Sequence, residues 1–451
     1  MLVINGKEII VNRAYVQISE VDEAYCQLAK KIIEEGVLTK NRTGVDTLAI
    51  PNWNFVFHLD KEFPIPETKL VPAKNFASEI QWIHQEQSNK VKWLQDRDNH
   101  IWDDWEVNED GIYRIYEQGE NAINDPERMV PLVRQVINPK NGNIEKVPVL
   151  NIFGKPKMVK SWDLMKGKTN PRTIKEAVLF GKKYAGTIGE AYGYINHVYH
   201  SPQRVEWTLK NHPEDRRINI ELNQYIHLVK AVLPSCVHLA EFTCIDGILH
   251  VAIDQRSADI SVGGPFNFPE YALFTGMLAK TCNLKVGTMS WHITNAHIYV
   301  DQLEGMKKQL KRYKYMVEYR DIIKKTSDEE LQVLYDSLKE KFETLHRKAT
   351  ILLNGEIDNI KMSDRVKALK SKDEELASQY EESFERKITF EHMVTRKTPT
   401  LELASHDSIF EYSTDYVSKG DPYLKENPIG NKELVLKNYT PMPFIKMPVA
   451  Q

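Results

Sequence analysis

Residues 253–274 read I-D-Q-R-S-A-D-I-S-V-G-G-P-F-N-F-P-E-Y-A-L-F, and the rest of the chain is organised around them. The first half alternates between apolar and polar residues, which is typical of a half-buried β-strand. Gly263-Gly264-Pro265 then predicts a turn, and a helix is expected to begin near Asn267. The stretch therefore predicts a strand, a turn and a helix in direct succession.

Polar side chains gather where this expected strand ends. Arg256 next to Ser257 suits a phosphate, because a guanidinium is a forked, charged donor and the hydroxyl adds another. Asn267 can donate and accept at once, as recognition of a pyrimidine edge requires. Two simpler interpretations stay open. Arg256 and Asp259 could form a surface ion pair, and Asn267 could cap the helix.

The same stretch resembles the QRS-x-D…G-x-PFN signature of the thymidylate synthase family, which includes nucleotide hydroxymethylases. The resemblance implies an α+β (α/β) fold with a large mixed β-sheet flanked by helices, forming a single catalytic domain over residues 1–451. It is interrupted twice. We expect an insertion of loops and short strands with little core at residues 112–187, and a charged helical insertion at residues 305–394.

Composition excludes several classes of function. Of the 451 residues, 41% are hydrophobic and 27% are charged, which is ordinary for a soluble globular protein. A net charge of −3 gives no reason to expect a nucleic-acid surface, and no apolar run is long enough for a membrane span. The N-terminus does not resemble a signal peptide, and the four cysteines lack metal-ligand spacing. We expect a cytoplasmic protein without a metal site.

Cys236 is the candidate nucleophile. The sequence after it predicts a β-hairpin with Asp246-Gly247 at the turn, so the thiol is expected where a loop enters a strand. A free cysteine is more often an inert core residue, an interpretation that suits Cys244 and Cys282. Cys236, in contrast, matches the catalytic cysteine of the family, and nearby arginines would favour its thiolate.

The resemblance implies a nucleotide site that arginines of two chains build together. Arg42, in the loop N-R-T-G, and Arg256 would bind the phosphate of dUMP with Ser257. Arg216 and Arg217 would reach across the interface of an obligate homodimer to the partner's phosphate. Four converging guanidinium groups suit a dianion. Without the resemblance, Arg216-Arg217 would be an exposed charge cluster.

The resemblance also assigns the base, the sugar and the folate. Glu79, on a helix expected over residues 76–93, would manage protons and water, because partial burial can raise the pKa of a carboxyl group. Each residue type also has a plain structural use, such as surface charge for Glu79. The remaining assignments are Tyr192 beside the cysteine; His297 and Tyr299 for the sugar hydroxyl; Trp102, Trp105, Leu233, Asp259, Gly263, Phe266 and Ala450 for the folate, with residues 439–451 closing over it.

Together these residues predict one-carbon transfer to a uracil nucleotide. Cys236 would add to C6 of dUMP, and Asn267 would stabilise the resulting enolate charge. C5 would then take the one-carbon unit of 5,10-methylenetetrahydrofolate. The exocyclic methylene so formed would accept water, giving 5-hydroxymethyl-dUMP, or a hydride from the folate, giving dTMP.

Departures from the synthase pattern favour water. Ser235-Cys236-Val237 stands in place of P-C-H, Thr294-Asn295 in place of G-G-D, and Thr68-Lys69-Leu70-Val71-Pro72 in place of T-K-R-C-H. Asn267 favours uracil, since the cytosine-specific relatives carry Asp there. We therefore expect a deoxyuridylate hydroxymethylase of a phage with modified DNA. A thymidylate synthase and a catalytically inactive nucleotide-binding or partner-binding relative are the alternatives.

Overall fold

The computed structural model describes residues 2–41, 43–117, 127–160, 174–355 and 357–449. A seven-stranded mixed sheet lies at its centre. Its strands are β3 (Val37–Thr39), β4 (Thr47–His58), β10 (Ile218–Glu221), β11 (Val237–Ile245), β12 (Ile248–Gln255), β13 (Ala258–Asp259) and β14 (Lys285–Tyr299). The order is β10-β11-β12-β14-β4-β3, with β13 also paired to β14. Both β12 and β13 run parallel to β14, and the other pairs are antiparallel, so the expected α+β fold with a mixed sheet is confirmed.

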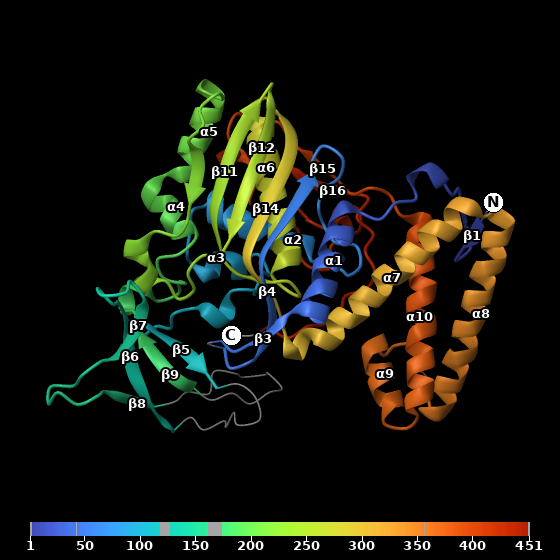
Figure 1. Ribbon diagram of the computed structural model, residues 1–451, viewed down its shortest axis with the longest axis horizontal. Helices are drawn as coiled ribbons and strands as arrows, with labels where there is room; N and C mark the ends of the chain where they lie inside the picture. Colours follow the sequence, from blue (N-terminus) through green and yellow to red (C-terminus); the bar gives the residue numbers. More distant parts are fainter. Residues whose placement is uncertain (1, 42, 118–126, 161–173, 356, 450–451) are drawn as a thin grey trace.

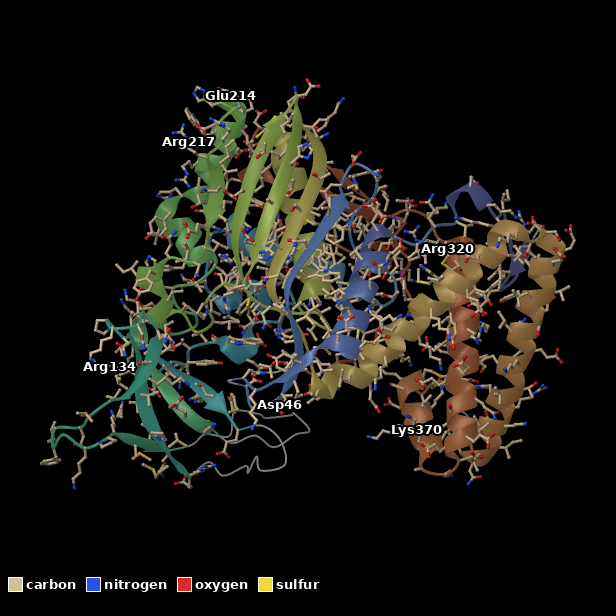
Figure 2. All side chains as sticks on the ribbon, in the orientation of Figure 1. Asp46, Arg134, Glu214, Arg217, Arg320 and Lys370 are labelled. Atoms are coloured by element: carbon tan, nitrogen blue, oxygen red, sulfur yellow. The ribbon has the colours of Figure 1, made fainter. Side chains whose placement is uncertain are left out.

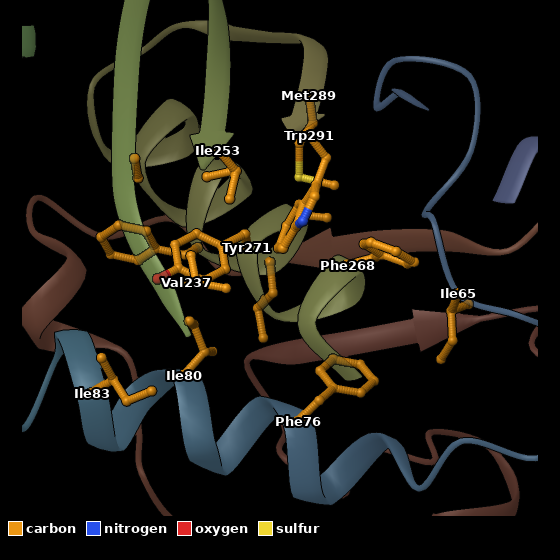
Figure 3. Close-up of a cluster of buried hydrophobic side chains, with 14 of the residues drawn as sticks. Ile65, Phe76, Ile80, Ile83, Val237, Ile253, Phe268, Tyr271, Met289 and Trp291 are labelled. Atoms are coloured by element: carbon orange, nitrogen blue, oxygen red, sulfur yellow. The ribbon is translucent and has the colours of Figure 1, made fainter. Parts of the chain in front are cut away.

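Helices pack with this sheet into the main hydrophobic core. They are α1 (Glu20–Glu35), α2 (Ala73–His84) and α6 (Gly264–Thr281). Figure 3 shows α2 packed against α6 and the strand ends, with Ile80 of α2 towards Val237 and Phe76 of α2 below the helix that carries Phe268. Alternation in β14 buries Trp291 and its neighbours two residues away, because successive strand residues point to opposite faces.

The opposite face of the central sheet is open. Alternate residues of β11, β12, β14 and β4 form rows across it, and these side chains are exposed or half-exposed. One row is Glu241, Ala252, Ser290 and Val56, and the next is Leu239, Asp254, His292 and Asn54. Antiparallel and mixed sheets tolerate one solvated face, provided that its residues are mostly polar or small.

A second, smaller sheet occupies the first of the two expected insertions. Its strands are β5 (Ile112–Tyr116), β6 (Met129–Ile137), β7 (Ile144–Pro148), β8 (Met158–Lys160) and β9 (Ile174–Leu179). The order is β5-β9-β6-β7, with β8 also paired to β6, and a small apolar cluster lies between the strands. This is more strand and more core than expected, because the apolar residues lie scattered between lysine-rich and glycine-rich turns.

A helical unit projects from the other side of the molecule (Figure 1). It consists of α7 (Leu303–Lys325), α8 (Asp328–Leu352), α9 (Met362–Lys370) and α10 (Glu374–Thr395). Ser327 caps the start of α8: its hydroxyl accepts from the Glu330 N–H while the Glu330 carboxylate accepts from the Ser327 N–H. The hairpin of β1 (Leu2–Ile4) and β2 (Lys7–Ile9) packs against α8. None of the described helices is long and apolar enough to cross a membrane.

The C-terminal segment is held between the core and this helical unit. Arg312 of α7 is 1% exposed and its guanidinium donates to the carbonyl oxygens of Thr68 (2.8 Å) and Pro443 (2.7 Å). It also forms an ion pair with Glu385 of α10, with Nε 2.6 Å from Oε2. The Tyr439 hydroxyl donates to the Pro66 carbonyl at 3.1 Å. The helical unit therefore contributes directly to the position of the tail.

Shorter elements complete the chain. They are α3 (Val91–Gln95), α4 (Gly193–Tyr199), α5 (Ser201–Asn211), β15 (Thr400–Leu403), β16 (Leu434–Lys437) and 3-10 helices at Arg13–Tyr15, Asp103–Trp105, Lys182–Tyr184, Tyr225–Lys230, Val300–Gln302, Ile409–Glu411 and Pro422–Lys425.

Two expected helix boundaries are wrong. The helix expected over residues 76–93 ends at His84, and Gln87 adopts φ 52° before α3 begins. Just past the helix end, the Ser88 backbone packs so closely on Gly193 that a Cβ on Gly193 would lie 2.1 Å from the Ser88 carbonyl oxygen. The helix expected near Asn267 begins earlier, after Gly263, with a proline in its first turn.

Candidate active site

Cys236 lies immediately before β11, with its thiol partly exposed. Its backbone N–H donates to the hydroxyl of Tyr192 at 3.1 Å, and Nη2 of Arg256 lies 3.6 Å from its sulfur. Tyr192 has φ 50° and ψ −111°, a strained conformation for a residue with a side chain. A sulfur at a strand end beside a guanidinium and a hydroxyl is the environment of a reactive thiol, not of a core cysteine.

Arg256 is fixed by the loop that carries the cysteine. Its Nη2 donates to the Pro234 carbonyl at 2.6 Å and its Nε to the Ser235 carbonyl at 3.1 Å. The alternative of an Arg256–Asp259 ion pair is wrong, because Asp259 accepts from Gln302 instead. The neighbouring Ser257 is half-buried at the same strand end.

An aromatic wall connects the cysteine to Glu79. The Trp102 and Tyr192 ring centroids lie 5.2 Å apart in an edge-to-face arrangement, and Trp105 packs on the other side of Trp102 at 5.5 Å. The Trp102 indole donates to Oε1 of Glu79 at 2.7 Å. Burial raises the pKa of Glu79, although hydrogen bonds from Glu270 and Trp102 oppose the shift. Glu79 is thus a buried carboxyl group and not surface charge.

Asn267 is held in one orientation by a chain of hydrogen bonds. The Trp291 indole donates to Oε1 of Gln255 at 2.9 Å, and Nε2 of Gln255 donates to Oδ1 of Asn267 at 3.0 Å. Nδ2 of Asn267 then donates to Oε2 of Glu270 at 3.1 Å. The alternative of a helix cap is wrong, because the cap of α6 is Gly263.

Asp259 and His297 lie side by side at the paired strands β13 and β14. Oδ1 of Asp259 accepts from the N–H of Ser261 at 2.9 Å, and its Oδ2 accepts from Nε2 of Gln302 at 2.8 Å. The same Gln302 nitrogen donates to the Pro448 carbonyl of the tail at 2.9 Å. Burial raises the pKa of Asp259 and lowers that of His297, while the charge of each opposes the shift of the other.

The residues expected to contact the sugar and the folate are placed as follows. His297 and Tyr299 face each other with ring centroids 5.2 Å apart, and Nδ1 of His297 lies 2.9 Å from Oδ1 of Asn295. Leu233 and Phe266 are partly buried against the main core. A Cβ on Gly263 would lie 3.4 Å from the Asp259 carbonyl oxygen, so this glycine approaches the Asp259 backbone closely.

Four expected residues are not placed with the others. Arg216 and Arg217 lie in the loop before β10, where the Arg217 side chain is 88% exposed and pairs with Asp215. Figure 2 shows Arg217 at the end of the sheet beside α5. Because Ile218 pairs with Phe242, six residues along β11 from Cys236, the two arginines are roughly 20 Å from the thiol of their own chain. Arg42 and Ala450 lie outside the described residues.

Three further residues, to which the sequence assigned no role, form hydrogen bonds with the expected site residues. They are Gln255, Gln302 and Glu270. Glu270 offered a signal, since it is the sole acidic residue in the mostly apolar α6, and a charged residue on a largely buried helix needs a partner. Gln255 is the first residue of the QRS signature, but the signature gave it no role. Neither Gln255 nor Gln302 offered a signal for its partners, which come from distant strands and from the tail.

Comparison with known proteins agrees with this geometry. The family profile described as thymidylate synthase matches residues 23–345. A thymidylate synthase from Clostridium beijerinckii (strain ATCC 51743 / NCIMB 8052) is 31% identical over 291 residues, which is 64% of this chain and 82% of that protein. The chain therefore belongs to the thymidylate synthase family, whose members transfer a one-carbon unit from 5,10-methylenetetrahydrofolate to dUMP.

Proposed function

We propose that this one-carbon transferase is a deoxyuridylate hydroxymethylase, which adds water in the last step and makes 5-hydroxymethyl-dUMP. The thiolate of Cys236 adds to C6 of the uracil ring, with the Arg256 guanidinium 3.6 Å from the sulfur to stabilise its charge. Asn267 binds the base edge and stabilises the enolate, so that C5 becomes nucleophilic. Loss of the C5 proton and of the folate leaves an exocyclic methylene, to which water adds.

The residues around Asp259 suit the folate. Buried carboxylate oxygens can accept from the ring N–H groups of a pterin, and the rings of Trp102 and Trp105 offer flat apolar surfaces for it. 5,10-Methylenetetrahydrofolate supplies the one-carbon unit at the oxidation level of formaldehyde. We assign its pterin to Asp259 and its enclosure to the tail, which Gln302 contacts at Pro448.

The observation that carries the choice of water is a second buried carboxyl group. Glu270 of α6 and Glu79 of α2 are both buried where these two helices pack together. Burial raises the pKa of each carboxyl group; the charge of Glu79 raises the pKa of Glu270 further, whereas the hydrogen bond with Glu270 lowers that of Glu79. Two such carboxyl groups share one proton, so the pair carries one negative charge and can accept a second proton. Water loses a proton when it adds to a methylene carbon, whereas hydride transfer from the folate releases none. A proton acceptor next to the wall of the site therefore favours water.

A thymidylate synthase remains the second candidate. The indole of Trp102 is only 7% exposed, and an apolar wall of this kind excludes water from the site. The relative from Clostridium beijerinckii also carries that name. An inactive binding protein fits less well, because a partly exposed thiol with a fixed guanidinium has no use in nucleotide binding alone.

Product analysis decides between these functions. The protein is incubated with dUMP and 5,10-methylenetetrahydrofolate, and nucleotide and folate products are identified together by mass spectrometry. We expect 5-hydroxymethyl-dUMP with tetrahydrofolate. Formation of dTMP with dihydrofolate would show a synthase, and binding of dUMP without either product would show a binding protein. A hydroxymethylase of this specificity would serve a phage with modified DNA in the cytoplasm of its host.

We further propose a homodimer in which the open face of the central sheet meets a second copy. The row of Glu241, Ala252, Ser290 and Val56 is exposed on this face, and Arg216 and Arg217 extend from its edge. These arginines would bind the phosphate of the nucleotide in the partner's site, whereas they lie too far from the thiol of their own chain to act there. Sedimentation should give a dimer mass. Chains with Cys236→Ala and chains with Arg216→Ala and Arg217→Ala should regain activity when mixed, which a monomeric site would not allow.

A further inference from the structure

Glu270 is a buried carboxyl group to which the proposed function gives one task, as a proton acceptor beside Glu79. It lies in α6, whose only other charged residue is Lys280, and it is 2% exposed. Its Oε2 accepts from Nδ2 of Asn267 at 3.1 Å, whereas its Oε1 receives no N–H or O–H from any residue that the structure describes. No lysine, arginine or histidine of the described residues forms an ion pair with it within 4.0 Å. A buried, ionised carboxylate in this state would be very unfavourable.

A proton shared with Glu79 resolves this. Burial raises the pKa of Glu270 first, and the charge of Glu79 and its hydrogen bond raise it further. Glu79 already accepts from Trp102 through Oε1 at 2.7 Å. With one proton between the two carboxyl groups, each has a hydrogen-bond partner and the pair carries one negative charge. Tyr192 and Tyr271 also face the pair, and because burial raises the pKa of both, they stay neutral near pH 7.

The other oxygen of Glu270 ends the chain of amides that starts at Trp291. An indole N–H can only donate, so it turns Oε1 of Gln255 towards itself and Nε2 towards Asn267. Oδ1 of Asn267 must then face Gln255, and its Nδ2 must face an acceptor, which is Glu270. In this orientation the amide still has one N–H for O4 of uracil and one lone pair for its N3–H. Cytosine reverses both groups, and a turned amide would suit it.

We propose that Glu270 is a positioning residue of the one-carbon transfer, which fixes the Asn267 amide for uracil and shares one proton with Glu79. The proposal rests on the assignment of Asn267 to the base of the nucleotide. Glu270 acts through its two neighbours, and no contact of its own with the substrate is needed.

Two substitutions separate its two tasks. In Glu270→Gln, the amide oxygen can still accept from Asn267, while the amide nitrogen donates to Glu79 and no proton is shared. We expect dUMP affinity within about threefold of wild type and an unchanged preference for dUMP over dCMP. The alkaline limb of the kcat profile should move to lower pH, because a lone Glu79 that accepts from an amide loses its proton more easily than the pair does.

Glu270→Leu removes the acceptor as well. We expect dUMP to bind about tenfold more weakly and the preference for dUMP over dCMP to narrow by about tenfold or more, as for loss of a hydrogen-bonded orientation. The matched control is Glu206→Gln in α5. Glu206 is also buried, at 6% exposed, but its carboxylate accepts from the Ser408 hydroxyl and not from Asn267. The substitution should change neither the dUMP affinity nor the preference for dUMP over dCMP. Circular dichroism checks folding, and if the leucine variant does not fold, the pH profile of Glu270→Gln decides.

Affinities are measured by equilibrium dialysis with dUMP and dCMP alone. They therefore report on Glu270 whichever product forms, and a failure of the hydroxymethylase assignment remains distinguishable from a failure of this proposal. An unchanged pH profile in Glu270→Gln together with unchanged base preference in Glu270→Leu would overturn it.

Discussion

The substitution Arg312→Met tests whether the helical unit holds the C-terminal tail in place. Arg312 is 1% exposed, and its guanidinium joins three parts of the molecule: the Thr68 carbonyl of the core, the Pro443 carbonyl of the tail and the Glu385 carboxylate of α10. Methionine keeps most of the side-chain volume and removes every one of these donors. The change therefore isolates the polar contacts from the packing.

The expected loss of stability is about 3 kcal/mol. Breaking a buried ion pair by removing one partner destabilises by roughly 3–5 kcal/mol, because the remaining charge is left uncompensated. Here Glu385 is 0% exposed but keeps Lys308, whose Nζ lies 3.0 Å from Oε1. This second cation places the expected value at the lower end of the range. Loss of the donor to Pro443 should also loosen the tail and raise the KM for the folate, with little effect on dUMP binding.

Urea unfolding measures the effect with two probes. All eight tryptophans precede residue 303, so their fluorescence reports on the catalytic core, whereas far-ultraviolet circular dichroism reports strongly on α7–α10. The matched control is Arg320→Met on the same helix, where the side chain is 28% exposed and forms an ion pair with its neighbour Asp321. We expect a change in the free energy of unfolding within about 0.5 kcal/mol. Equal, small effects of both substitutions, or an unchanged folate KM in Arg312→Met, would refute the reasoning.

Three further outcomes follow from the site and its surroundings. Cys236→Ala should abolish turnover and retain dUMP binding, and measurable product formation by this variant would remove the nucleophile from the mechanism. Tyr192→Phe removes the acceptor of the Cys236 N–H and should lower kcat about fivefold to tenfold, equal to ~1 kcal/mol, in steady-state assays at saturating substrate. His392, 6% exposed, has its pKa lowered to about 4 by burial, so the unfolded chain binds this proton more tightly and stability falls as the pH drops from about 6.5 through 4. Urea titrations at several pH values measure the free energy of unfolding. Over this pH range it should fall by on the order of 3 kcal/mol less in His392→Asn than in the wild type. An identical pH dependence in both proteins would contradict the assignment of the loss to His392.

Local signals in the sequence were sufficient for the elements that carry the nucleophile. The Asp246-Gly247 turn predicted the hairpin of β11 and β12, and both residues have positive φ, 52° and 73°. Ala24, Leu28, Ile32 and Ile33 recur at helical spacing before Gly36, a pattern that is sufficient to predict α1 and its C-cap at Gly36. These features depend on neighbours within a few residues, which a sequence displays directly.

Contacts between distant segments were not predictable in the same way. The close approach of Ser88, which follows the end of α2 at His84, to Gly193 joins segments about a hundred positions apart. The orientation of Asn267 depends on Trp291 through the parallel pairing of β12 with β14, which places Gln255 and Trp291 on one face. Resemblance to a family supplied the functional residues, but the pairing of Glu79 with Glu270 required the crossing of α2 and α6.

The bridge at Gln302 has a thermodynamic corollary. One nitrogen with two hydrogens serves both the Asp259 carboxylate and the Pro448 carbonyl. Coupling free energies are reciprocal. If a ligand binds at Asp259 more tightly when Pro448 is docked, its binding must raise the equilibrium constant for docking by the same factor. Ligand binding at Asp259 and docking of the chain end at Pro448 are thus linked equilibria. A measurement of one as a function of ligand concentration also determines the other.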